Sequence, residues 1–286
     1  MRMRGMTEKV NTNNWDGILY PIPGRKDKVV ITISGSEGGL GYAGKQARFL
    51  QENGIPALAL GYFKTKNTGK NLDRIPLELI ASAIKLLKEK GYQRFGICGI
   101  SKGAEYALAA AIFFPELSCV IVKTPSWFYS EGMTAGKRPS GTSCWSYQGR
   151  ELPFTPYKTR KFPMLKLMWD NKEFNILEVN TGKNVIPESI IPVEKIRAPI
   201  LIFSTAADTV WPSEESSRRL ECRLKEQGFP YPYQHISFEH MGHMMLENCG
   251  PEFKWFIRSE RAYPAECKEE RKAMGNACIR WIEDMW

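Results

Sequence analysis

The stretch RFGICGISKGAEYALAAA at residues 94–111 limits the possible fold more than any other, because it joins strand-like to helix-like sequence through a Gly-Ile-Ser-Lys-Gly turn. A strand that turns at once into a helix needs small residues two positions before and after its apex, since a side chain there would strike the neighbouring backbone. Gly99 and Gly103 flank Ser101 in this way. The stretch therefore predicts a nucleophile elbow that exposes the Ser101 hydroxyl at a helix N-terminus, with an ordinary glycine-serine loop as the alternative.

Runs of β-branched residues alternate with amphipathic segments along most of the chain. Besides the elbow, the runs predict strands at 27–35, 55–62, 118–124, 198–208 and 232–238. Helical spacing of apolar residues predicts helices at 43–53, 76–90, 214–226 and 265–286. Strands that alternate with helices indicate an α/β fold with a mostly parallel central sheet flanked by helices on both faces.

The chain is long enough to form one large domain. Its 286 residues are 43% hydrophobic and 12% aromatic, and α/β folds of this length commonly remain undivided. Residues 1–27 are read as a polar N-terminal lead. Residues 126–191 carry many aromatic residues among Pro, Gly and Lys without sustained periodicity, and so long a structureless connection is rare unless it is functional. We expect a single domain, 1–286, in which residues 126–191 form a cap inserted over the active site.

Charge and cysteine use argue against several classes of protein. The net charge is +9, but the 40 Lys and Arg are spread among 31 acidic residues, which favours a solvated basic surface, or attraction of anionic substrates, over a nucleic-acid site. Seven cysteines without CxxC spacing indicate a reducing compartment and neither a disulfide framework nor a metal site. No segment has the apolar length of a signal peptide or a membrane span. We expect a cytoplasmic protein without metal or other cofactor.

A nucleophilic Ser101 needs a base to take its proton. The chain has three histidines, all after the last strand-like runs, as the order Ser, acid, His of an elbow-bearing fold requires. His235 lies within the alternating segment 232–238, which favours a structural or surface role. His240 and His243 occupy the following loop, and both are candidates for the base.

The base needs a carboxylate that orients it. Two aspartates lie between the serine and the histidines: Asp170 in the aromatic insert, and Asp208 just after the apolar run PILIF. Asp208 is favoured because it follows a predicted strand, at the carboxyl end where α/β sheets build their sites. Glu214 and Glu215 are further possibilities, but they begin a predicted helix and serve its N-terminal dipole.

An acyl-transfer intermediate also needs backbone N–H groups that hold its oxyanion. The amide of Lys102, directly after the nucleophile, is one candidate, and the loop 35–38 after the first major strand offers the other. The amides of Ser36 and Glu37 both qualify, and a plain glycine-rich turn is the alternative. The Glu37 side chain is expected to point away from the oxyanion or to pair with a cation such as Lys102.

Four stretches together carry a family resemblance: GSEGGLGYAGKQARFLQENGIPALALGYF, GICGISKGAEYALAAA, SYQGRELPF, and IPVEK with FSTAADTVWPS and HMGH. They resemble the C-terminal catalytic domain of the acyl-CoA thioesterase and bile acid-CoA:amino acid N-acyltransferase family, from about Val29 to the terminal helix. The resemblance implies an α/β-hydrolase fold, with Ser101 as nucleophile and Asp208 as acid. The Gly-His pair of the family matches Gly242-His243, which implies His243 as the base.

Two further points follow from the resemblance. Members with serine at the nucleophile look like thioesterases and those with cysteine like acyltransferases, so Ser101 implies hydrolysis. The larger members carry an immunoglobulin-like domain before this one, which the 28 residues before Val29 are too few to form. Single-domain bacterial-type relatives and esterases similar to dienelactone hydrolase keep the triad without it.

The predicted function is cleavage of an acyl thioester or ester, a small-molecule partner, through an acyl-enzyme, most simply as an acyl-CoA thioesterase. The alternatives are a carboxylesterase, an acyl-CoA:amino acid N-acyltransferase, and a noncatalytic binding protein on a hydrolase scaffold. The candidate substrate-binding residues, each with a structural role as its alternative, are the aromatic Tyr62, Trp127 and Trp211 for the acyl group and the basic Lys158, Arg160 and Lys161 for CoA phosphates.

Overall fold

An eight-stranded sheet is the centre of the computed structural model, which describes residues 6–159, 168–169, 172–173, 176, 184–250 and 253–286. The strand order is β1-β2-β4-β3-β6-β7-β12-β13. The strands from β4 to β13 run parallel, and at one edge β2 runs antiparallel to both of its neighbours, β1 and β4. The predicted mostly parallel α/β sheet is confirmed. The strands are β1 (Glu8–Asn11), β2 (Asp16–Tyr20), β3 (Lys28–Ile33), β4 (Ala57–Gly61), β6 (Arg94–Ile100), β7 (Leu117–Lys123), β12 (Ile200–Thr205) and β13 (Tyr233–Phe238).

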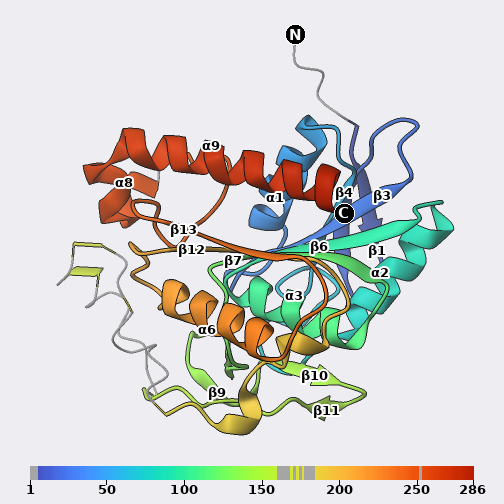
Figure 1. Ribbon diagram of the computed structural model, residues 1–286. Coiled ribbons are helices and arrows are strands. Elements are labelled where there is room, and N and C mark those ends of the chain that lie inside the picture. Colours follow the sequence, from blue (N-terminus) through green and yellow to red (C-terminus); the bar gives the residue numbers. More distant parts are fainter. Residues whose placement is uncertain (1–5, 160–167, 170–171, 174–175, 177–183, 251–252) are drawn as a thin grey trace.

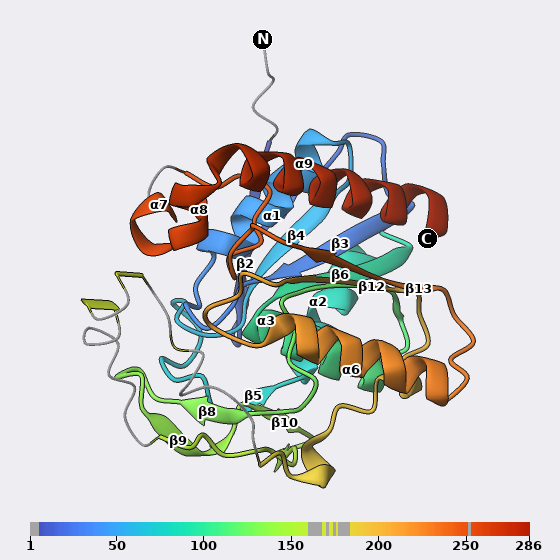
Figure 2. The ribbon, with the colours of Figure 1, turned by 60° about the vertical axis from the view of Figure 1, so that its left-hand side comes forward.

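Helices cover both faces of this sheet (Figures 1 and 2). α1 (Gly41–Glu52) and α9 (Pro264–Arg280) lie over one face, and α2 (Glu78–Glu89), α3 (Lys102–Phe113) and α6 (Ser213–Glu226) lie over the other. Leu77, Ile80, Ile84 and Leu87 of the apolar stripe predicted for α2 are buried, whereas Ala81 of the same predicted stripe is exposed and Ala83 is buried instead. Two short helices, α7 (Phe253–Phe256) and α8 (Arg258–Ala262), precede α9, and no described helix has the length and apolar character needed to cross a bilayer.

The N-terminal lead differs from its prediction, because it carries β1 and β2. Their hairpin adds the antiparallel edge of the sheet, and Trp15 in its turn is fully buried, with Nε1 3.0 Å from Ser82 Oγ of α2. β1 is four residues long with one buried side chain, Val10, so its sequence carries almost no apolar alternation. Short, mostly exposed edge strands of this kind leave little periodic signal.

The described part of segment 126–191 forms small strands on the far side of α3 and α6 from the main sheet (Figure 1). β10 pairs in parallel with β5, which precedes α2, so the segment is attached to the body of the domain. Arg160, Lys161 and Asp170 lie outside the described residues. The elements here are β5 (Ile75–Pro76), β8 (Glu131–Met133), β9 (Pro139–Ser143), β10 (Trp145–Tyr147), β11 (Arg150–Glu151) and the 3₁₀ turns Pro187–Ser189 and Val193–Lys195.

The strand order creates a switch point between β3 and β6. From β3 the chain moves to β4 on one side and then to β6 on the other, so the loops after β3 and β6 leave the sheet edge in opposite directions. Crevices at the carboxyl ends of such strands are where open α/β sheets bind ligands. Ser36 and Glu37 follow β3 and Ser101 follows β6, so the fold places both predicted parts of the site at this crevice.

Candidate active site

Ser101 lies at the sharp turn between β6 and α3. Its backbone has φ 55° and ψ −120°, and a positive φ is uncommon for a residue other than glycine. A Cβ on Gly99 would lie 2.1 Å from the carbonyl oxygen of Gly103, and one on Gly103 would lie 2.2 Å from that of Ser34. No side chain fits at either position, so the glycine spacing in the sequence is a steric requirement of this turn.

A chain of hydrogen bonds joins Ser101 to two distant side chains. Ser101 Oγ lies 2.8 Å from His243 Nε2, and His243 Nδ1 lies 2.8 and 2.9 Å from the two carboxylate oxygens of Asp208. His243 and Asp208 are both buried. Oδ1 of Asp208 also accepts the backbone N–H groups of Val210 and Trp211 at 2.9 Å each. An imidazole whose Nδ1–H is held by such a carboxylate presents Nε2 to the hydroxyl as a proton acceptor.

The other two histidines bind elsewhere. His235 Nε2 is 2.7 Å from Ser204 Oγ on the neighbouring strand, as expected for a structural residue. His240 Nδ1 is 3.0 Å from Glu270 Oε1 of α9. The structure therefore places neither of them against the Ser101 hydroxyl.

The alternative acids lie outside the site or outside the described residues. Glu214 and Glu215 begin α6, where each pairs with an arginine one turn later, Arg218 at 2.9 Å and Arg219 at 2.7 Å. Asp170 is among the residues that are not described. Among the described candidates, one predicted carboxylate reaches the imidazole.

The loop after β3 passes beside the nucleophile. Glu37 turns its carboxylate back onto the loop, where Oε1 accepts the N–H of Gly35 at 2.9 Å. Burial raises the pKa of this carboxyl, and the hydrogen bonds that it accepts from the Glu37 and Gly35 amides, with the charge of Lys137, offset part of the effect. The Nζ of Lys137 donates to the carbonyl of Ser36 at 2.8 Å. The loop is thus held by side chains from its own sequence and from the insert.

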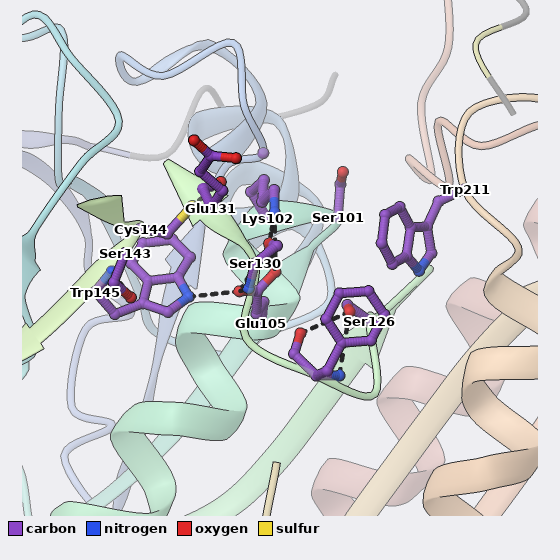
Figure 3. A network of polar contacts seen from close by, with 12 residues as sticks. Ser101, Lys102, Glu105, Ser126, Ser130, Glu131, Ser143, Cys144, Trp145 and Trp211 are labelled. Carbon is purple, nitrogen blue, oxygen red and sulfur yellow. Dashed lines mark hydrogen bonds and ion pairs between the residues drawn. The ribbon is translucent and has the colours of Figure 1, made fainter. Parts of the chain in front are cut away.

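Lys102 does not pair with Glu37. Its Nζ lies 3.1 Å from Glu105 Oε2 one turn along α3 and hydrogen-bonds Ser130 Oγ of the insert (Figure 3). Glu105 is fully buried and also accepts the Nε1–H of Trp145 at 2.8 Å and the N–H of Ser130 at 2.8 Å. Of the two alternatives expected for Glu37, pairing with Lys102 does not occur, because a carboxylate three residues away on the same helix face is the nearer partner of Lys102.

A cavity of about 420 Å³ opens at Ser101. The insert contributes Met133, Lys137 and Tyr157 to its wall, and α7 contributes Phe253 and Phe256. Most of the wall is apolar. The described lining residues are Gly35, Ser36, Glu37, Tyr42, Ile100, Ser101, Lys102, Glu105, Thr124, Ser126, Met133, Lys137, Tyr157, Met168, Ile176, Thr209, Val210, Trp211, His243, Met244, Phe253, Phe256 and Ile257.

The predicted substrate-binding residues fall into different places. Trp211 lines the cavity and lies opposite Ser101 in Figure 3. Tyr62 does not line it; the ring is buried, and its hydroxyl donates to the carbonyl of Gly35 at 2.9 Å, so Tyr62 supports the loop from beneath. Trp127 is absent from the lining as well, and its ring lies 4.5 Å from the guanidinium of Arg219.

Several lining residues carry no recognisable signal in the sequence. Lys158, predicted to meet phosphates, is exposed and does not line the cavity, whereas Lys137, which does, lies in a short loop between β8 and β9. Phe253 and Phe256 belong to a four-residue helix, which is too short for a periodic pattern. Among the described residues, no group of three or more His, Cys, Asp or Glu side chains is arranged to hold a metal ion, and all seven cysteines are free thiols.

Comparison with known proteins agrees with this architecture. The family model described as BAAT / Acyl-CoA thioester hydrolase C terminal matches residues 75–270. The chain is 26% identical over 228 residues to acyl-coenzyme A thioesterase 2, mitochondrial, of Rattus norvegicus, covering 79% of this chain and 46% of that protein. It is 28% identical over 227 residues to acyl-coenzyme A thioesterase 6 of Mus musculus, covering 75% and 48%. The chain spans about half the length of the curated relatives that it matches.

Solved structures share the fold at lower identity. A putative dienelactone hydrolase from Klebsiella pneumoniae aligns with a TM-score of 0.59 at 11% identity, covering 96% of both chains. A putative alpha/beta hydrolase from Agrobacterium tumefaciens aligns with a TM-score of 0.57 at 14% identity, covering 98% of both. The chain thus has the α/β-hydrolase fold, and with its family match over more than half of its length it belongs to the BAAT/acyl-CoA thioester hydrolase C-terminal family of α/β-hydrolase enzymes.

Proposed function

We propose that this chain is a serine hydrolase that cleaves an acyl thioester, most simply an acyl-CoA, through Ser101, His243 and Asp208. The observation that carries the proposal is the continuous hydrogen-bonded chain from Ser101 Oγ to the Asp208 carboxylate at the floor of a cavity. Family membership and the thioesterase names of the curated relatives support the choice of substrate.

The reaction proceeds in two halves. His243 Nε2 takes the proton of Ser101 as Oγ attacks the acyl carbonyl, and Asp208 holds the imidazolium that forms. The imidazolium then gives its proton to the departing thiolate, which leaves the acyl group on Ser101. A water molecule attacks this ester with His243 again as base, and release of the acid restores the serine.

Two backbone amides hold the oxyanion in each half. The Lys102 amide lies in the first turn of α3, where N–H groups have no partner within the helix and the dipole favours negative charge. We assign the second donor to Ser36, because the amide of Glu37 is engaged by its own carboxylate. The Ser36 carbonyl is held by Lys137, which fixes the orientation of the loop.

The apolar wall of the cavity binds the acyl group. Met133, Val210, Trp211, Met244 and Phe253 offer carbon surface around the nucleophile, and burial of each acyl methylene there contributes about 0.8 kcal/mol. Residues 126–191 act as the cap of a single domain, a role supported by Met133, Lys137 and Tyr157, which line the cavity. The basic surface attracts the anionic thioester over longer distances.

Labelling with an organophosphonate probe tests the nucleophile. The folded parent protein is expected to be modified at Ser101, and Ser101→Ala is expected to lose both the label and turnover. Failure of the folded parent to label at Ser101 contradicts the proposal and favours a binding protein on a hydrolase scaffold.

A panel of acyl-CoAs and p-nitrophenyl esters separates the remaining alternatives. A thioesterase turns over at least one acyl-CoA with a higher kcat/KM than any simple ester, whereas the reverse order identifies a carboxylesterase. Addition of glycine distinguishes transfer from hydrolysis, because an N-acyltransferase forms an amide product. We expect free acid and no amide.

A further inference from the structure

A buried lysine lies directly beneath the candidate active site. Lys123 is the last residue of β7, and its side chain is fully buried. Its contact with Gln46 of α1 puts it on the sheet face that α1 and α9 cover, and Figure 2 shows those two helices. The Nζ of Lys123 forms an ion pair with Glu247, whose side chain is 5% exposed, and lies 3.3 Å from Oε1 of Gln46 on α1. Burial, the largest single influence, lowers the pKa of the ammonium, but the Glu247 carboxylate and the neighbouring Cys98 and Cys278 together outweigh it, so the pKa is raised and Lys123 stays charged.

A buried ion pair stabilises a core less effectively than apolar side chains do. Removing two charges from water costs free energy that their attraction only partly returns, and an apolar pair of similar size is often at least as stable. The proposed reaction uses neither Lys123 nor Glu247 directly. The pair therefore contributes something other than hydrophobic stability, and its contacts indicate what that is.

Both partners are attached to segments of the active site. The carbonyl of Lys123 accepts the N–H of Ser101 at 2.9 Å, so its backbone supports the strained residue of the elbow. Glu247 follows His243 by four residues in the loop that carries the imidazole. The hydroxyl of Thr124, next to Lys123, lies 3.4 Å from the carbonyl of His243 and reinforces the same connection.

Gln46 extends the connection to the third part of the site. While its Oε1 accepts from Lys123, its Nε2 donates to the carbonyl of Ile33 at 3.2 Å. Ile33 ends β3, immediately before the loop that contains Ser36. One buried network thus spans the elbow, the histidine loop and the oxyanion loop, which are far apart in the sequence.

We propose that Lys123 and Glu247 are positioning residues that set the distance between the Ser101 hydroxyl and the His243 imidazole. The inference rests on the proposed function, because it assigns the pair a role in the same site. Lys123 holds the serine through its backbone and the histidine loop through its ammonium. Loss of the ion pair leaves the Ser101 and His243 side chains present but releases the loop that holds His243 in line with Ser101.

The test is the rate of organophosphonate labelling at Ser101, which depends on the alignment of serine and histidine and not on binding of the natural substrate. Lys123→Met and Glu247→Gln are expected to label at least about tenfold more slowly than the parent, since a displacement of about 1 Å in a catalytic group can cost about 100-fold. With the preferred acyl substrate, kcat is expected to fall while KM changes little. Unfolding in urea checks that each variant is folded under the assay conditions.

Two controls separate alignment from stability. Leu224→Ala truncates a fully buried residue near the far end of α6, so it lowers the unfolding midpoint while the labelling rate stays at the parental value. Lys85→Met removes an exposed lysine and is expected to change neither quantity. The double variant Lys123→Met/Glu247→Met removes both charges and is expected to regain the parental midpoint, because an apolar pair replaces the buried ions.

The double variant decides the question. If it unfolds like the parent but labels slowly, the pair aligns the site. If the double variant labels at the parental rate, the pair has no positioning role. The same conclusion follows if the single variants fold and label at the parental rate, or if no variant of the series folds. If the parent labels at Ser101, the proposed function stands regardless of the variants' labelling rates. If the folded parent does not label, the proposed function itself is contradicted, and the positioning role with it.

Discussion

The hydrogen bonds to the Asp208 carboxylate allow the orientation of an asparagine at this position to be predicted. Oδ1 accepts two backbone N–H groups, from Val210 and Trp211, in addition to its contact with His243. In Asp208→Asn the side-chain oxygen continues to accept the N–H groups of Val210 and Trp211, because the NH₂ group cannot accept hydrogen bonds. The NH₂ group therefore turns toward His243 Nδ1. The imidazole then carries its proton on Nε2 and cannot accept one from Ser101. We expect kcat to fall by about 10³–10⁴-fold.

Measurement of kcat on the preferred acyl substrate checks this prediction. Glu215→Gln is the matched control, since it makes the same acid-to-amide change at an exposed position of α6 and is expected to keep parental activity. Parental turnover by Asp208→Asn contradicts the role given to the carboxylate.

Glu37 gives a prediction about pH and stability. Its pKa is raised above the usual value of 4.5, chiefly by burial, so the folded protein holds this proton more tightly than the unfolded chain. Stability then falls as pH rises from the unfolded pKa through the folded pKa, because charging Glu37 costs the folded state free energy. Glu37→Gln keeps an acceptor for the Gly35 amide and removes the charge. We expect its unfolding free energy, relative to the parent, to increase as pH rises above 4.5.

Urea unfolding of both proteins at a series of pH values between 4 and 7 measures this difference. A difference that is constant across the series contradicts the prediction. An unfolding free energy of the parent that rises relative to that of Glu37→Gln as pH increases also contradicts the prediction, because that trend requires a lowered Glu37 pKa in the folded state.

The residues at the site differ in how far sequence alone reveals them. Ser101 is found because its turn tolerates only glycine at two fixed positions, and few histidines and aspartates remain as partners. Sequence predicts Tyr62 for the substrate because it is a large aromatic residue just after a strand, and Trp127 because it is one of the aromatic residues of the insert, but core residues share both properties. Lys123 lies at the end of an apolar run, where a lysine usually reaches solvent, so its buried pairing with Glu247 depends on tertiary contacts that no local pattern records.

At the scale of elements, the elbow depends on close contact between α3 and the end of β3. A Cβ at Gly103 would meet the Ser34 carbonyl at 2.2 Å and the Ile33 side chain at 2.9 Å, and backbone cannot rotate away as a flexible side chain can. Gly103→Ala therefore pushes α3 from the sheet. We expect a loss of about 1–3 kcal/mol or more in unfolding free energy, with strongly reduced labelling of Ser101.

Gly69→Ala is the control for this substitution. No atom lies within 4 Å of the position that its Cβ would take, so its unfolding midpoint and labelling rate are expected to match those of the parent. If Gly103→Ala behaves like the control in urea unfolding, the close packing assigned to the elbow is incorrect.

The elements that the sequence reveals are those whose pattern is long and buried on one side. The stripe of α2 and the apolar runs of β3, β7 and β12 fall within or close to their predicted ranges. The strands of the insert are two to five residues long and pair with one another or with β5, so neither length nor alternation identifies them. Their place is fixed by the Glu105 network, which is a tertiary feature.

At the scale of the whole molecule, residues 6–20 belong to the folded body. Trp15 is fully buried between the β1–β2 turn and α2, where its Nε1–H donates to Ser82, and Thr12 bonds the backbone of the same turn. Truncation of this ring leaves a large cavity at the edge of the sheet. We expect Trp15→Ala to lower the unfolding free energy by about 3–5 kcal/mol, the usual cost of removing a buried aromatic side chain.

Trp255→Ala provides the comparison, because that ring is 80% exposed and its removal is expected to change the unfolding free energy by no more than about 0.5 kcal/mol. Since Trp15 lies at the opposite side of β4 and β3 from the elbow, folded Trp15→Ala is expected to label at Ser101 at the parental rate. Urea unfolding followed by circular dichroism measures the first effect, and probe labelling below the transition measures the second. A Trp15→Ala protein as stable as Trp255→Ala would mean that the N-terminal hairpin is not part of the cooperative unit, as a polar lead would not be.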